Sequence, residues 1–127
     1  MTPKKKILVV DDEKDVLSYL TALFEDAGYA TLTAETGSQC MEKAKAEKPD
    51  LITLDITMPE QSGVRAYRKL REDAELAKIP VIIVTAIGEE MEMFLAKLKG
   101  FAKPDGFMNK PIVPDELIAM AKKVLSR

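Results

Sequence analysis

Short apolar runs alternate with segments in which apolar residues recur at helical spacing, from one end of the chain to the other. The runs predict strands at residues 6–10, 30–34, 51–55, 80–85 and 106–109. The first, third and fourth runs are almost continuously apolar, which is typical of central parallel strands that are covered on both faces. The second run, ATLTA, only alternates, and this pattern predicts a strand at the edge of the sheet.

Helical periodicity fills most of the segments between these runs. One helix is expected over 16–27, with Gly28 as its stop, and a second over about 38–47, before Pro49. Apolar residues mark three further helices: Val64, Tyr67 and Leu70 for the third, Phe94, Leu95 and Leu98 for the fourth, and Leu117, Ile118, Ala121 and Val124 for the last. Strands that alternate with helices in this way predict an α/β fold with a doubly wound parallel sheet.

Composition and charge exclude several classes of protein. The 127 residues, 46% hydrophobic and 31% charged, are expected to form one globular domain over 1–127, without an output domain. The net charge of -2 gives no reason to expect nucleic-acid binding, and no apolar segment is long enough to cross a membrane. The single cysteine, Cys40, suits a reducing compartment, and its place on the inner side of the second helix favours a buried, inert thiol. The absence of histidine excludes histidine-based catalytic triads and zinc sites.

Five polar side chains follow the expected strands at their carboxyl ends. They are Asp11 and Asp12 after the first strand, Asp55 at the third, Thr85 at the fourth and Lys110 after the fifth. Ligands bind beyond this edge in doubly wound sheets, so these side chains are expected to share one site. Each is weak evidence alone, because a strand-end acid often caps a turn. Together, three acids and a lysine indicate a divalent cation, and oxygen ligands favour Mg²⁺ over zinc or copper.

Three other kinds of protein fit parts of this pattern. A calcium-binding EF-hand fits the acids of DDEKD, but Val16 stands where that loop needs glycine and Ala22 where it needs glutamate. A flavin-binding flavodoxin would need a loop rich in glycine and hydroxyl groups after the first strand, where this chain is acidic. A phosphatase of the aspartyl-phosphate type would use a strand-end acid such as Asp55, with a second aspartate at the position of Thr57. We keep the phosphatase as the less favoured alternative.

Four short motifs stand at the expected strand ends: the pair Asp11-Asp12, the segment DITMPEQSG at 55–63, Thr85-Ala86 and Lys110-Pro111. The second matches the pattern Asp-x-x-Met-Pro-x-x-x-Gly. In this order and context, the chain resembles the receiver domain of two-component response regulators from about residue 6 to residue 125. The resemblance implies a flavodoxin-like fold, in which five parallel strands lie in the order 2-1-3-4-5.

The resemblance also implies a role for each residue of the site. Asp55 would accept a phosphoryl group. Asp12 would hold Mg²⁺ directly and Asp11 mainly through water, and Asp55 and the backbone carbonyl of Thr57 would be further ligands. Lys110 would pair with Asp55 and, after phosphorylation, with a phosphoryl oxygen.

A conformational switch is implied in the same way. Thr85 would bond to another phosphoryl oxygen and move inward, and Phe107 would fill the space that opens. The Lys110–Pro111 peptide bond would be cis. Segment 99–107 departs from the family by a few additional residues, including Pro104, which leaves the choice of partner open.

On this resemblance, the expected function is a signalling switch and not an enzyme with a substrate of its own. A sensor histidine kinase or a histidine phosphotransfer protein would donate the phosphoryl group. The phosphorylated chain would then bind a downstream protein through the face formed by the fourth helix, the fifth strand and the fifth helix. It would act in the cytoplasm as a monomer or a phosphorylation-dependent dimer, with no direct nucleic-acid contact and no membrane insertion. The alternative within this family is a receiver portion of a larger multidomain regulator.

Overall fold

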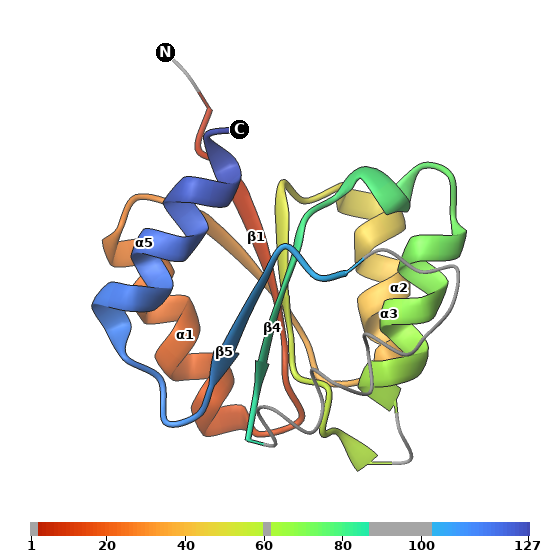
Figure 1. Cartoon of the computed structure of the whole chain (residues 1–127), viewed down its shortest axis with the longest axis horizontal. Coiled ribbons are helices and arrows are strands. Elements are labelled where there is room, and N and C mark those ends of the chain that lie inside the picture. The colour runs from red at the N-terminus through yellow and green to blue at the C-terminus, as the bar shows by residue number, and fades with distance from the viewer. Residues whose placement is uncertain (1–2, 60–61, 87–102) are drawn as a thin grey trace.

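A parallel sheet forms the centre of the computed structural model, which describes residues 3–59, 62–86 and 103–127 (Figure 1). Its strands are β1 (Lys6–Val10), β2 (Ala30–Ala34), β3 (Leu51–Leu54), β4 (Val81–Thr85) and β5 (Gly106–Asn109). The described helices are α1 (Lys14–Asp26), α2 (Gly37–Glu47), α3 (Ser62–Glu72) and α5 (Pro114–Leu125), together with the 3-10 helix η2 (Leu76–Lys78). This arrangement confirms the predicted α/β class.

The order of the strands determines where a ligand site is expected at one edge of the sheet. The strands lie in the order β2-β1-β3-β4-β5, and every neighbouring pair is parallel. This is the order that the resemblance implied, and β2 lies at an edge as its alternating sequence predicted. After β1 the chain turns to one side to form β2 and then returns to form β3 on the other side. The loops after β1 and β3 therefore diverge, and a crevice between such loops is the usual ligand site of doubly wound sheets.

Helices cover both faces of the sheet, with α1 and α5 on one face and α2 and α3 on the other (Figure 1). Successive residues of β1 pack against the helices on opposite faces of the sheet. Leu8 and Val10 pack with α2 and α3, and Ile7 and Val9 pack with α1 and α5. Each such side chain contributes about 1.5–3 kcal/mol when it is fully buried, which explains why β1 is apolar at consecutive positions. In the described part of the chain, no helix is long and apolar enough to span a membrane.

The boundaries of some elements differ from those that the sequence predicted. β3 ends at Leu54, so Asp55 lies one position beyond the strand and not within it. α1 begins at Lys14, before the first apolar residue of its periodic pattern. η2 was not predicted, because three residues are too few to show a helical period. The expected helix around Phe94, Leu95 and Leu98 lies outside the described residues.

Cys40 occupies the core between α2 and the sheet, as its position on the helix predicted. Its side chain is completely buried. Burial raises the pKa of the Cys40 thiol to about 12. Because the thiolate is the reactive form, the thiol is inert in the folded protein at neutral pH.

Candidate functional site

Three backbone hydrogen bonds continue the parallel ladder just past the strand ends. Asp11 donates its N–H to the last carbonyl of β2 at 3.1 Å, and Asp55 donates to the last carbonyl of β1 at 3.0 Å. Lys110 donates to the last carbonyl of β4 at 2.9 Å. The sheet therefore fixes the backbone of two acids and the lysine, and their side chains start from defined positions at one edge.

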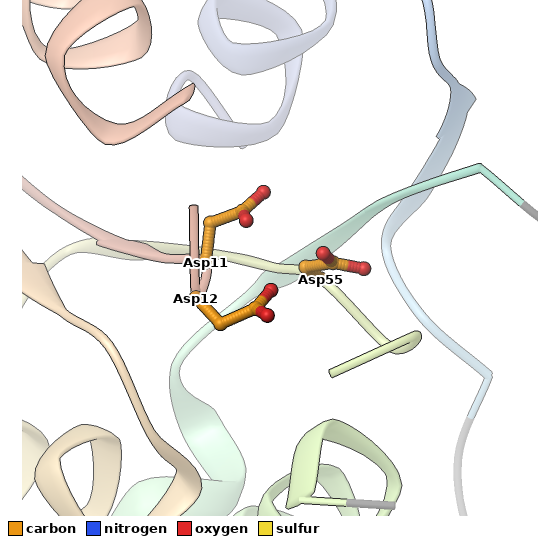
Figure 2. A group of neighbouring side chains, drawn as sticks. All are labelled: Asp11, Asp12 and Asp55. Atoms are coloured by element: carbon orange, nitrogen blue, oxygen red, sulfur yellow. The ribbon is translucent and has the colours of Figure 1, made fainter. Parts of the chain in front are cut away.

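The three acids that follow β1 and β3 lie together where the loops after these strands diverge. Figure 2 shows Asp11 and Asp12 on the loop after β1, beside Asp55 on the loop after β3. One carboxylate oxygen from each lies within 4.8 Å of the others. Asp11 and Asp55 are only 1% and 2% exposed, whereas Asp12 is open to solvent. The structure thus brings the predicted acids into one cluster with two buried members and one accessible member.

Lys110 reaches this cluster from the end of β5. Its Nζ lies 2.8 Å from Asp11 Oδ2 and 3.3 Å from Asp55 Oδ2, and it donates a hydrogen bond to each. The exposed carboxylate of Glu13 is a third ion-pair partner at 3.8 Å. The peptide bond between Lys110 and Pro111 is cis, as the resemblance implied. One largely buried ammonium group therefore bridges the two buried carboxylates.

Burial and pairing act in opposite directions on these charges. Burial raises the pKa of the Asp11 carboxyl, and the hydrogen bonds from Lys110 and from the Glu13 N–H only partly offset this effect. Burial acts to lower the pKa of Lys110, but the hydrogen bond to Asp11 and the charges of Asp55 and Asp11 raise it overall. Lys110 is therefore protonated. Burial removes water from the Asp11 carboxylate, and this loss of solvation disfavours its charged form beside Asp55.

Thr57 makes contacts with Asp55 that sequence reasoning missed. Its backbone N–H and its side-chain hydroxyl both donate to Asp55 Oδ1, at 2.8 and 2.7 Å. The expectation from the sequence concerned only the backbone carbonyl of Thr57. An aspartate followed two residues later by a hydroxyl residue is the usual signal of a side chain that closes its own turn. These bonds orient the carboxylate and leave Oδ2 facing Lys110.

Thr85 and Phe107 lie on the two neighbouring strands β4 and β5. Thr85 is completely buried at the end of β4. Phe107 is half-buried and lies opposite Ile83, two positions before Thr85 in the same strand. Residues two apart along a strand share a face, so Thr85 and Phe107 belong to the same side of the sheet. That face also carries Ile83, in the core cluster against which Phe107 packs.

Gly63 allows α3 to begin directly against the loop that carries Asp55. A Cβ atom at this position would lie 2.2 Å from the Asp55 carbonyl oxygen and 2.8 Å from the Cα atom of Ile56. Both atoms belong to the backbone, so a side chain could fit only if the loop or the helix moved. The glycine that closes the motif at 55–63 thus has a physical role in placing Asp55.

The donor set of this cluster fits a hard divalent cation. Three acidic side chains and the Lys110 ammonium group place more negative than positive charge here, and such a cation would offset the difference. All the clustered ligand atoms are oxygens, and their spacing allows Asp11, Asp12 and Asp55 to share one ion. Mg²⁺ fits this description, because it commonly combines one or two carboxylates with phosphate oxygens and water.

Comparisons with known proteins agree with this geometry. Residues 7–122 match the family model described as the response regulator receiver domain. The chain is 38% identical over 123 residues to the alkaline phosphatase synthesis transcriptional regulatory protein PhoP of Bacillus subtilis, across 97% of this chain and 49% of that protein. It is 37% identical over 121 residues to protein PilH of Pseudomonas aeruginosa, across 95% of this chain and 98% of that protein. The chain thus spans about half of PhoP and nearly all of PilH.

Solved structures show the same fold. A CheY-like response regulator receiver domain protein from Methanospirillum hungatei superposes with a TM-score of 0.85 at 26% identity, across 98% of this chain and 95% of that chain. The chemotaxis protein CheY4 of Vibrio cholerae superposes with a TM-score of 0.84 at 25% identity, across 96% of this chain and 99% of that chain. The similarity therefore extends over nearly the whole chain and is not limited to the motifs.

Proposed function

This chain belongs to the response regulator receiver domain family of two-component systems, and on that premise we propose that it is a signalling switch controlled by phosphorylation of Asp55. The observation that carries the proposal is the position of Asp55, which is buried at the carboxyl edge of the sheet, bonded to Lys110 and clustered with the pair Asp11-Asp12. Carboxylates serve as nucleophiles in phosphoryl transfer when neighbouring cations offset the charge of the incoming group.

In the proposed reaction, a carboxylate oxygen of Asp55 attacks the phosphorus atom of a phosphohistidine donor. A P–O bond forms while the P–N bond of the donor breaks, and its electron pair leaves with the imidazole nitrogen. Lys110 Nζ, 3.3 Å from Asp55 Oδ2, can turn to a phosphoryl oxygen and neutralise part of its charge. When bound by Asp11, Asp12, Asp55 and the Thr57 carbonyl, Mg²⁺ would supply further positive charge to the phosphoryl group.

We propose Thr85 and Phe107 as the residues that convert phosphorylation into a change of shape. The Thr85 hydroxyl would bond to a phosphoryl oxygen and draw the end of β4 toward Asp55. Phe107, which is half-buried on the same face, would move into the space that opens. The added charge would then bias an equilibrium between two arrangements of β4 and β5.

The partners follow from this chemistry. The phosphoryl donor would be a histidine kinase or a histidine phosphotransfer protein, and its phosphohistidine must belong to another protein because this chain has no histidine. We propose that the phosphorylated chain acts in the cytoplasm by binding a downstream protein through a face that includes β5 and α5. PilH is similar over nearly its whole length and PhoP over half of it, so a receiver portion of a longer regulator is the alternative. Both versions share the same phosphorylation chemistry.

The test is incubation with acetyl phosphate and MgCl₂, followed by intact-protein mass spectrometry. We expect the wild type to gain one phosphoryl group as acetate leaves, and we expect EDTA to prevent the gain. Asp55→Asn is the matched control, because it keeps the size of the side chain and removes the nucleophile. Equal labelling of this variant, or no labelling of the wild type, would defeat the proposal. Steady turnover of an unrelated phosphomonoester would favour the phosphatase alternative.

A further inference from the structure

Asp105 stands immediately before β5, at the end of that strand far from the candidate site. Its backbone N–H donates to the Val81 carbonyl at 2.8 Å, and its Oδ2 accepts the Val81 N–H at 2.8 Å. One residue therefore satisfies both polar backbone groups of the first residue of β4. The carboxylate takes the place that a backbone carbonyl would have if β5 began earlier.

Two arginines hold this carboxylate. Arg71 of α3 donates to Oδ2 of Asp105 at 3.1 Å, and Arg127 donates to Oδ1 at 2.7 Å. Burial acts to raise the pKa of Asp105, but the hydrogen bonds from the Val81 N–H, Arg127 and Arg71 lower it overall. The carboxylate is therefore ionised at neutral pH and accepts bonds at both of its oxygens.

Arg71 is itself fixed in place. Its side chain is only 8% exposed, and it donates to the carbonyls of Ala77 and Ile79 at 3.1 and 3.2 Å. Its guanidinium carbon lies 5.1 Å from the centre of the Tyr67 ring, in a cation–π arrangement. The anchor for Asp105 thus belongs to the rigid packing of α3 and η2 against the sheet.

β5 needs such an anchor because it is short and lies at an edge. It has four residues and pairs only with β4 in the described part of the sheet. A slip of one position would turn Met108 out of the core, and it would move Lys110 away from its bond with the Thr85 carbonyl. The register is therefore held at one end by Asp105 and at the other by Lys110.

We propose that Asp105 is a positioning residue for phosphorylation of Asp55, which it affects by fixing the register of β5 and hence the place of Lys110. This inference rests on the proposed function. Asp105 touches none of the reacting groups, and it acts along the strand that separates it from Lys110. The hydrogen bond to the Val81 N–H carries the effect, while the bonds to Arg71 and Arg127 keep the carboxylate oriented.

The experiment measures the rate of acetyl phosphate labelling per folded molecule, with folding monitored by circular dichroism. Asp105→Ala should slow labelling about tenfold or more, to the rate of Lys110→Ala, because small displacements of a charge-stabilising group are costly. The double variant Asp105→Ala/Lys110→Ala should label no more slowly than Lys110→Ala alone. Asp105→Asn keeps an acceptor for Val81, so it should restore a rate within about twofold of the wild type.

Leu20→Ala supplies the control for lost stability. It removes a buried side chain of α1 and leaves the groups around Asp105 unchanged, so it should lower the melting temperature without slowing labelling per folded molecule. The inference would be overturned if Asp105→Ala took up label as fast as the wild type. It would also be overturned if adding Asp105→Ala to Lys110→Ala slowed labelling by as large a factor as Asp105→Ala does in the wild type. Equal slowing by Leu20→Ala would also overturn it. A wild type that takes no label would defeat the proposed function instead, and the inference with it.

Discussion

At the scale of single residues, the site depends on how one ammonium group is shared. Lys110 bonds to Asp11 at 2.8 Å and to Asp55 at 3.3 Å, so its shorter contact is with the acid that we do not propose as the nucleophile. Two buried carboxylates without this cation would repel each other and lose their solvation. Lys110 thus stabilises the unphosphorylated protein before it takes part in phosphoryl transfer. A divalent cation bound nearby would offset the same carboxylate charges as the lysine.

Removal of Lys110 should therefore change how the protein responds to magnesium. We expect Lys110→Ala to lower the free energy of unfolding in EDTA by on the order of 2 kcal/mol, because it leaves buried carboxylates unpaired. Added MgCl₂ should raise the melting temperature of this variant more than that of the wild type, since the ion would replace the lost charge. Thermal unfolding with and without MgCl₂ measures both effects. Acetyl phosphate should still label the variant, more slowly than the wild type.

Lys45→Ala is the matched control for the lysine prediction. Lys45 lies on α2 and forms a mostly exposed ion pair with Asp73 at 3.9 Å. Such surface pairs contribute about 0–1 kcal/mol, so this variant should behave like the wild type with and without magnesium. An equal magnesium response in Lys110→Ala and the wild type would show that the lysine and the ion do not compensate for the same carboxylates.

At the scale of elements, the start of α3 decides where Asp55 stands. The helix begins at Ser62, and Gly63 in its first turn lies against the backbone of the loop after β3. Ser62 also accepts the N–H of Gly37 at 2.6 Å, which ties the start of α2 to the start of α3. The loop that carries Asp55 is therefore confined between β3 and two joined helix ends.

Gly63→Ala should disturb both stability and chemistry. The new methyl group would overlap the Asp55 carbonyl oxygen, and overpacking of this kind costs about 1–3 kcal/mol. We expect a lower melting temperature together with slower acetyl phosphate labelling per folded molecule, because relief of the overlap must move Asp55 or α3. Chemical denaturation and mass spectrometry measure the two effects.

Gly28→Ala provides the comparison for that substitution. Gly28 follows α1 with a φ of 99°, where an alanine is strained, and nothing lies within 4 Å of its added Cβ. This variant should also lose stability, because a side chain is disfavoured at positive φ. Its labelling per folded molecule should match the wild type, since the turn is remote from the loop after β3. Equal labelling by Gly63→Ala would contradict a role for the helix start in placing Asp55.

The sequence predicted the elements well where burial on both faces leaves a continuous apolar run, as in β1 and β4. It also predicted that Asp11, Asp12, Asp55 and Lys110 would meet, because parallel strands end at a common edge. It could not predict the contacts of their side chains. The shorter bond of Lys110 to Asp11 depends on rotamers and on the neighbouring loops, which no local pattern encodes.

Asp105 illustrates the same limit over a longer range in the chain. In the sequence it is an isolated acid in the segment KPDG, which is typical of a turn. Its partners, Arg71 and Val81, are distant in sequence and reach it only after α3 has packed on the sheet. The anchor of β5 thus arises from tertiary structure, and pairwise contacts of this kind have no periodic signal.

At the scale of the whole molecule, one sheet joins two hydrophobic cores, so opening of either layer exposes the strands that carry the site. Cys40 lies in the layer of α2 and α3, and its N–H bonds to the Thr36 carbonyl at 3.0 Å. Thr36 also caps α2 through its hydroxyl, which accepts the N–H of Gln39 at 3.1 Å. With its helix held at the start and its side chain completely buried, the thiol becomes accessible only when this layer opens.

Because opening of this layer exposes the sheet that both cores share, we expect alkylation of Cys40 to report unfolding of the whole domain and its suppression by magnesium. The thiol has a pKa near 12 and is buried, so iodoacetamide should react slowly with the native protein and rapidly in denaturant. If magnesium binds only the folded state, a free magnesium concentration of ten times the dissociation constant should slow alkylation about elevenfold. Asp12→Ala should abolish that slowing, because it removes the accessible carboxylate of the proposed metal site. Mass spectrometry of the alkylated protein gives the rates.

Rapid alkylation of the native protein would instead indicate that α2 opens by itself. An alkylation rate that magnesium does not change would show that the exposure of Cys40 is not coupled to magnesium binding.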